Sequence, residues 1–183
     1  MLPCSPGIDR QVPAASGPET GLWVAVIAES SREADNPMSA SEQQKIVSIM
    51  RDNYLYANLA TCDGDQPRVR IVSPVVEDDM SIWVTTRSTS RKIKQLRENP
   101  KICLAFVEPP EGDKSVTVIG EAQIVPDLDK RRRVWKLAPF DLYEHFPAGP
   151  DSDDFCLLKI AVKRIEWREV GTGALKTYEP THQ

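Results

Sequence analysis

The sequence predicts a mainly β domain of the α+β class, a small antiparallel β-barrel with a few peripheral helices. Short segments of alternating or continuous apolar residues recur between residues 54 and 170, as in β-strands. Turn-forming residues such as Asp63-Gly64-Asp65 separate the first of these segments and indicate hairpins. Few segments have helical spacing, and hairpin-linked strands with one early helix and one helical insertion are typical of such a barrel.

The first part of the chain differs in composition from the remainder. Residues 1–38 are rich in Pro, Ser, Ala and Gly and show no sustained hydrophobic period, which is typical of a disordered leader. Met38 is followed by Ser-Ala-Ser-Glu, which resembles a natural start, so this segment could instead be a gene-model extension. Both alternatives place the folded domain at residues 39–183.

The predicted domain begins with a helix. Ser39 or Ser41 is its predicted N-cap, and it runs to about residue 52 with Ile46, Ile49 and Met50 at helical spacing. The first three strands are expected at residues 54–61, 68–76 and 80–86, with Glu77-Asp78-Asp79 as the second turn.

A second helix is predicted at residues 90–99. Asn99-Pro100 ends it, because the residue before a proline resists the α conformation. The last three strands are expected at residues 102–107, 115–125 and 155–170, with a charged helical stretch at 127–145 before the last. The prediction is therefore six strands in one domain.

The composition argues against several classes of protein. A net charge of −4 disfavours a nucleic-acid partner. The longest apolar run, residues 21–28, is too short to span a bilayer, so no membrane partner is expected. The four cysteines lack the spacing of metal ligands and only two histidines are present, so we expect a cytoplasmic, reduced protein without a structural metal.

Residues 85–101 carry the most informative cluster of charge, with six bases and one acid. Arg91 and Lys92 fall in the first turn of the second predicted helix, where the macrodipole is positive and free N–H groups point outward. Bases are disfavoured there unless an anion binds, and the Ser90 hydroxyl adds a donor for a phosphate. The alternative is a solvated helix start that tolerates its charges.

Arg70 favours the phosphate interpretation. It lies within a predicted strand, between Val69 and Ile71, which are expected to face the core. An arginine in a barrel strand needs a partner, and a phosphate accepts the two parallel hydrogen bonds of its planar fork. We therefore predict that Arg70, Ser90, Arg91 and Lys92 hold a phosphate group.

The same residues carry a resemblance to a known family. The order and spacing of several short motifs resemble the pyridoxamine 5′-phosphate oxidase family, and the later ones its general stress protein branch. These motifs are PRVRIV (67–72), IWVTT (82–86), SRK (90–92), NP (99–100), VTVIG (116–120), FPAGPD (146–151) and IEW (165–167). The resemblance covers about residues 41–170.

The resemblance implies a six-stranded split β-barrel that forms a homodimer, with FMN at the subunit interface. By position, Arg70, Ser90, Arg91 and Lys92 would hold the FMN phosphate. Thr85 and Thr86 would contact the isoalloxazine and ribityl groups. Lys114 and Ser115 stand where the family places an Arg-Gln pair from the facing subunit. Trp83 could stack in the flavin cleft or pack in the core, as could Trp135 and Trp167.

Two departures separate this chain from the true oxidases. A second phosphate-binding lysine of those enzymes aligns with Val75. Their last strand carries an Arg-x-His pattern for the pyridoxal substrate, whereas residues 163–168 are Lys-Arg-Ile-Glu-Trp-Arg. We therefore do not expect oxidation of pyridoxamine phosphate.

These features predict an FMN-dependent oxidoreductase that acts on a small-molecule electron donor and acceptor. No general acid or base is evident, so the catalytic residues remain unassigned, and a non-catalytic flavin buffer or sensor is the alternative. FAD or a deazaflavin could replace FMN. Haem bound by His145 is a further alternative, because some split barrels bind haem.

Overall fold

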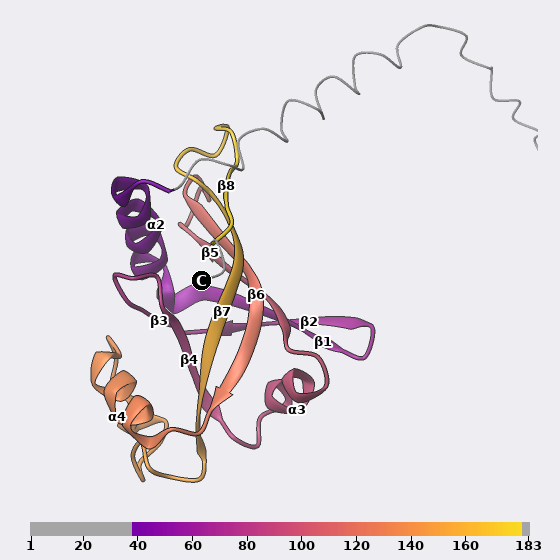
Figure 1. Ribbon diagram of the computed structural model, residues 1–183, viewed down its shortest axis with the longest axis vertical. Helices are drawn as coiled ribbons and strands as arrows, with labels where there is room; N and C mark the ends of the chain where they lie inside the picture. The colour runs from indigo at the N-terminus through magenta and orange to yellow at the C-terminus, as the bar shows by residue number, and fades with distance from the viewer. Residues whose placement is uncertain (1–37, 181–183) are drawn as a thin grey trace, which may run out of the picture. The chain divides into compact units, whose positions relative to one another are not determined.

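One antiparallel sheet of eight strands organises the structure, a computed structural model that describes residues 38–180 (Figure 1). The predicted mainly β class and the barrel-like fold are confirmed. The leader prediction for residues 1–38 falls, except for Met38, outside the described residues. The strands are β1 (Ala57–Asp63), β2 (Gln66–Val72), β3 (Val75–Val76), β4 (Ile82–Arg87), β5 (Lys101–Val107), β6 (Ser115–Val125), β7 (Phe155–Arg168) and β8 (Lys176–Tyr178).

The strand order shows that the sheet closes on itself. The order is β2-β1-β5-β6-β7-β4-β3, so β2 and β3 lie at opposite edges. Only Ser73 and Pro74 connect these two strands, and a link of that length spans about 10 Å at most. The two edges must therefore approach each other, which curls the sheet into a split barrel.

The number of strands differs from the predicted six. The segment expected as one strand at 68–76 is divided into β2 and β3, because Pro74 has no N–H to donate to a neighbouring strand. The short β8, which pairs with β7, was not predicted. The remaining predicted strands correspond to β1, β4, β5, β6 and β7, with residues 54–56 forming a 3-10 turn before β1.

Three α-helices accompany the sheet in the described residues: α2 (Ala40–Asp52), α3 (Arg91–Glu98) and α4 (Leu128–Leu137). Ser39 is the N-cap of α2, and its hydroxyl and the Glu42 carboxylate each accept the other residue's backbone N–H. The helix expected over 127–145 ends at Leu137, because Ala138 precedes Pro139. None of these helices is long and apolar enough to cross a membrane.

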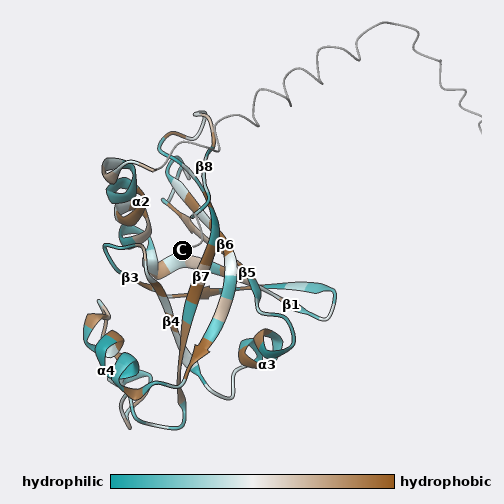
Figure 2. Ribbon diagram, viewed as in Figure 1, coloured by the Kyte–Doolittle hydropathy of each residue, from teal (hydrophilic) through white to brown (hydrophobic). Residues whose placement is uncertain are grey.

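Two hydrophobic clusters lie on the two faces of β4 and β7. Val84 and Leu158 face the larger cluster, which also contains the apolar side of α2. Trp83 and Leu157, one position earlier in each strand, face the smaller cluster with Val134 of α4. Figure 2 shows brown, hydrophobic segments in β4 and β7, and both colours in the helices. Strands buried on both faces give the barrel a rigid wall.

Gly120 provides a test of this packing. It follows a register shift between β6 and β7, and a Cβ at this position would lie 2.2 Å from the Ala161 carbonyl oxygen. We expect Gly120→Ala to lower the free energy of unfolding by about 2–3 kcal/mol, because the backbone must shift. Gly64→Ala is the control, since nothing lies within 4 Å and only its φ of +63° resists alanine, at about 1 kcal/mol. Urea unfolding measures both, and equal losses would contradict the proposed contact.

Candidate functional site

A cavity of about 320 Å³ lies between β2 and the start of α3, and we call it the anion cavity. It brings together four residues that the sequence analysis assigned to one site. Its lining residues are Arg68, Val69, Arg70, Ser90, Arg91, Lys92 and Gln95. In Figure 1, α3 lies beside the β1–β2 hairpin, which explains how residues twenty positions apart meet.

Neutral acceptors hold the Arg70 side chain in place. Its guanidinium donates to Thr61 Oγ1 at 2.6 Å, to Gln95 Oε1 at 2.9 Å and to the Leu59 carbonyl oxygen at 3.2 Å. Thr61 Oγ1 in turn donates to Gln95 Oε1 at 2.7 Å. This network orients the guanidinium without neutralising its charge.

Sequence analysis missed Thr61 and Gln95, although both are buried. A weak signal for each was present. Gln95 lies among Ile93 and Leu96 on the buried face of α3, and Thr61 shares the inward parity of Leu59 on β1. Buried polar residues in such positions need a partner, and here the partner is Arg70.

The predicted orientation of β2 is wrong. Val69 and Ile71 were expected to face the core, but they are 65% and 62% exposed, while Arg70 is half-buried. Because side chains alternate along a strand, only one of these two sets can point inward. Arg70 takes the inward orientation, because Thr61 and Gln95 accept hydrogen bonds from its guanidinium group.

Lys92 and Ser90 meet at Thr86, the last inward-facing residue of β4. Lys92 Nζ donates to Thr86 Oγ1 at 2.7 Å, and the hydroxyls of Thr86 and Ser90 lie 3.2 Å apart. Ser90 is the N-cap of α3, yet its side chain makes no capping hydrogen bond in the described structure. The Ser90 hydroxyl and the first N–H groups of α3 thus remain available as donors to a ligand.

The anion cavity is positively charged and uncompensated. No acidic residue lines it, and Arg70, Arg91 and Lys92 form no ion pair with any residue of the described range 38–180. Burial, and then the charges of Arg91 and Arg68, lower the pKa of Arg70. Burial, and then the charge of Arg70, lower the pKa of Lys92. An anion would remove this mutual repulsion, so the donor set fits a phosphate group.

Thr85 and Trp83 lie on the other face of β4 from Thr86. Thr85 lines a second cavity of about 350 Å³, the Thr85 pocket, together with Ser73, Arg87, Phe140 and His145 among others. Trp83 is only 4% exposed and lies in the smaller hydrophobic cluster, where its indole N–H donates to Glu77 Oε1 at 2.7 Å. For Trp83 the structure therefore shows core packing, and it lines neither cavity.

Lys114 and Ser115 do not line the anion cavity or the Thr85 pocket. Lys114 Nζ donates to Glu108 Oε1 at 2.8 Å, across the hairpin between β5 and β6. Ser115 Oγ accepts from Arg168 Nε at 3.2 Å. Within one chain, these two residues are separate from the other predicted site residues.

The fold and the site define a split β-barrel protein with a cationic cavity. A family model for pyridoxamine 5′-phosphate oxidase matches residues 43–168, and the chain belongs to this family. The predicted family is thereby confirmed. No curated protein matches the sequence.

Solved structures share the fold. A protein related to general stress protein 26 from Clostridium acetobutylicum is 17% identical, with a TM-score of 0.64, over 78% of this chain and 96% of that one. General stress protein 26 from Bacillus anthracis is 20% identical, with a TM-score of 0.60, over 73% and 96%. A heme binding protein from Mycobacterium smegmatis is 19% identical, with a TM-score of 0.59, over 79% and 59%.

The anion cavity predicts a thermal response to phosphate. Because the pKa of Lys92 is lowered in the folded chain, its charge costs stability at neutral pH, and this cost disappears only as pH rises from the folded pKa towards the ordinary value of 10.5. Saturating inorganic phosphate should raise the melting temperature by about 3 °C. Lys92→Met should be at least as stable as the parent without phosphate and should lose most of this response.

Lys94→Met is the matched control, because Lys94 is exposed on the same helix and does not line the cavity. It should respond to phosphate as the parent does. Differential scanning calorimetry at constant ionic strength measures all three proteins. An equal phosphate response in Lys92→Met and the parent would rule out the assignment of the anion cavity.

Proposed function

We propose that the chain binds FMN, with the phosphate in the anion cavity, and acts as a flavin-dependent oxidoreductase on a small molecule. The observation that carries this proposal is the cluster of Arg70, Arg91 and Lys92 without a single acid in the cavity. Arginine held by neutral acceptors offers its remaining donors to an anion in a fixed orientation. Several such charge-assisted bonds could supply roughly 1.5–3 kcal/mol each.

The separation of the two cavities supports a ligand with a phosphate at one end and a ring at the other. Arg70 lines the anion cavity, and Ser73, three residues further along the chain, lines the Thr85 pocket. Three residues of extended chain span about 10 Å. On β4, Thr86 accepts a hydrogen bond from Lys92 of the first site, and the adjacent Thr85 lines the second site on the opposite face of the strand.

FMN, when bound, supplies the hydride and electron chemistry, and the protein supplies position and electrostatics. Arg70, Ser90, Arg91 and Lys92 would bind and orient the phosphate, and Thr85 and Thr86 would position the remainder of the ligand. Two bases near the end of β7 form ion pairs, Lys163 with Glu121 and Arg164 with Glu166. This pairing agrees with the expectation that the chain does not oxidise pyridoxamine phosphate.

We further propose that the protein is a homodimer whose interface completes the FMN site. Val69, Ile71 and Tyr56 form an exposed apolar surface beside the anion cavity, each more than 60% exposed. Val69 and Ile71 lie on β2, an edge of the sheet, and such surfaces mark interaction sites. A second copy on this surface would also provide a route for Lys114 and Ser115 to reach the ligand.

The three cysteines of the described residues, Cys62, Cys103 and Cys156, are free thiols. Burial raises the pKa of both Cys103 and Cys156, which disfavours their reactive thiolate forms. Free thiols of this kind are compatible with the proposed cytoplasmic location.

The first experiment is a visible absorption spectrum of the purified protein before and after addition of FMN, with gel filtration of the same sample. Flavin bands that elute with a dimer would support the proposal. If the protein retains no FMN but binds FAD or a deazaflavin, that molecule replaces FMN as the proposed cofactor. Haem binding, lost on replacement of His145 in the Thr85 pocket, would replace the flavin proposal altogether.

Steady-state kinetics separate the enzyme from a flavin buffer or sensor. Oxidation of NADH or NADPH is followed with quinone and nitro acceptors. Turnover above that of free FMN at the same concentration supports an oxidoreductase. Tight FMN binding without such turnover would favour the non-catalytic alternative.

Removal of either central cation should weaken FMN binding. We expect Arg70→Ala and Lys92→Ala each to raise the Kd for FMN at least about tenfold, since each removes a charge-assisted hydrogen bond. Lys94→Ala should leave the Kd unchanged. Flavin fluorescence quenching gives the affinities, and circular dichroism confirms that the variants fold. Unchanged affinity in both cavity variants would disprove the phosphate site.

The exposed surface of β2 provides a test of the dimer. Ile71→Asp places a charge in the proposed interface and should shift the protein towards monomer by at least about tenfold in the dimer Kd. Leu128→Asp is the control, since Leu128 is also an exposed apolar residue but lies on α4. Analytical ultracentrifugation measures both variants. A dimer that Ile71→Asp does not weaken must use another surface.

A further inference from the structure

A third cavity, of about 540 Å³, is larger than either of the two described above, and we call it the apolar cavity. It lies between the end of α2, the residues around β3 and the end of α4. Its walls are mainly apolar and consist of Tyr54, Pro74, Val75, Val76, Leu137 and Pro139. A volume of this size with apolar walls is typical of a small-molecule site.

Acidic residues dominate the polar rim of this cavity. Glu77, Asp78 and Asp79 line it together with a single base, Arg51. Hydrogen bonds from Arg133 lower the pKa of Glu77, and those from Ser81 lower the pKa of Asp79. The one base that lines the cavity, Arg51, is already paired with Asp78, so the rim offers no unpaired cation to an anionic ligand.

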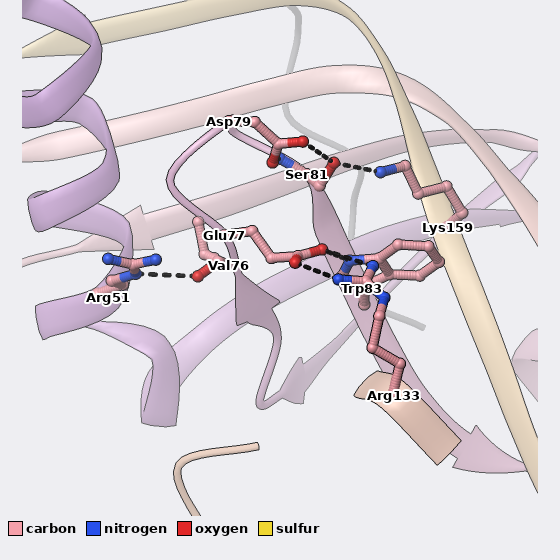
Figure 3. A network of polar contacts seen from close by, with 8 residues as sticks. All are labelled: Arg51, Val76, Glu77, Asp79, Ser81, Trp83, Arg133 and Lys159. Carbon is pink, nitrogen blue, oxygen red and sulfur yellow. Dashed lines mark hydrogen bonds and ion pairs between the residues drawn. The ribbon is translucent and has the colours of Figure 1, made fainter. Parts of the chain in front are cut away.

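Figure 3 shows hydrogen bonds that join the rim to neighbouring elements. Arg51 of α2 donates to the Val76 carbonyl oxygen at 2.9 Å and to Asp78 at 2.7 Å. Glu77 accepts from the indole of Trp83 and from Arg133 of α4 at 2.5 Å and 2.9 Å. These bonds tie α2 and α4 to the segment after β3, so the cavity is preformed.

Two cations near this rim, Lys159 and Arg133, lie against the ring of Trp83. Lys159 Nζ lies 4.3 Å from the centre of the Trp83 ring and donates to Ser81 Oγ at 2.6 Å. The Arg133 guanidinium lies 5.5 Å from the centre of the same ring. Neither residue lines the apolar cavity. Arg133 nevertheless pairs with the rim carboxylate of Glu77 and offsets its negative charge.

The apolar cavity adjoins the Thr85 pocket through three pairs of consecutive residues. Tyr54, Pro74 and Pro139 line the apolar cavity, whereas the neighbouring Leu55, Ser73 and Phe140 line the Thr85 pocket. The rings of Tyr54 and Phe140 are stacked, with centroids 5.9 Å apart and planes at 8°. This aromatic pair forms the partition between the two cavities.

We propose that the apolar cavity binds a planar, apolar molecule without negative charge, next to the aromatic partition. Its role as the substrate site rests on the proposed oxidoreductase function, whereas the binding itself does not. The chemical class follows from the apolar walls, a rim without an unpaired cation and the flat aromatic boundary.

Two matched fluorescent probes test this proposal on the full-length protein. N-phenyl-1-naphthylamine is apolar and uncharged and contains a planar naphthalene ring, and 8-anilino-1-naphthalenesulfonate is the same scaffold with a sulfonate. We expect saturable binding of the uncharged probe, at least about tenfold tighter than that of the anionic probe. Equal affinity for the two probes would overturn the assigned ligand class.

Two variants of α4 locate the probe. Leu137 lines the apolar cavity and Leu128 does not, although both are nearly equally exposed, at 45% and 44%. Leu137→Gln should weaken binding of the uncharged probe by about fivefold, and Leu128→Gln should leave it unchanged. Unchanged binding in Leu137→Gln would place the probe elsewhere and overturn the proposal.

The FMN titration of the same variants distinguishes this proposal from the proposed function. Leu137→Gln should bind FMN as the parent does, because it lies outside both the anion cavity and the Thr85 pocket. Probe binding without FMN binding would support the proposed ligand site in the apolar cavity and contradict the proposed flavin function. A shift of Leu137→Gln towards monomer, without saturable probe binding in the parent, would make this cavity a contact between copies and overturn the proposal.

Discussion

The two-residue link between β2 and β3 is the constraint on which the rest of the structure depends. Ser73 and Pro74 join strands from opposite edges of the sheet, so the sheet has to close. Closure sets β2 beside the start of α3, which follows β4, and thereby places Arg70 near Lys92. The same link contributes Ser73 to the Thr85 pocket and Pro74 to the apolar cavity. One short connection thus lines two of the cavities and positions the strand that lines the third.

The anion cavity illustrates a compromise between stability and binding. Half-buried cations that repel each other destabilise the folded chain, and an apolar replacement would commonly be neutral or favourable. The protein uses buried neutral partners, Thr61 and Gln95, to satisfy Arg70. These partners keep the side chain oriented and leave its positive charge uncancelled. Such an arrangement is expected where binding energy for an anion is more important than stability in its absence.

Much of the fold and part of the site could be predicted from the sequence. Alternating apolar residues and turn signals are local, so they revealed six segments of strand, and Ser90-Arg91-Lys92 was recognisable as a charged helix start. The inward direction of the Arg70 side chain could not be predicted, because it depends on Thr61 and Gln95, which are distant in sequence. Likewise, a tryptophan such as Trp83 can stack on a ligand or pack in the core, and only its burial in the smaller hydrophobic cluster shows that it packs in the core. The division at Pro74 was missed because strand pairing is a property of the whole sheet.

If the proposed phosphate ester binds in the anion cavity, the pH dependence of its binding would come mainly from the ligand. Arg70 lines this cavity, and a guanidinium does not release its proton in the neutral range. A free phosphate monoester, by contrast, gains its second negative charge with a pKa of about 6. Between mildly acidic and neutral solution, the charge of such a ligand would therefore change while that of the Arg70 guanidinium would not. The proposed attraction would then follow the titration of the phosphate ester against a constant positive charge.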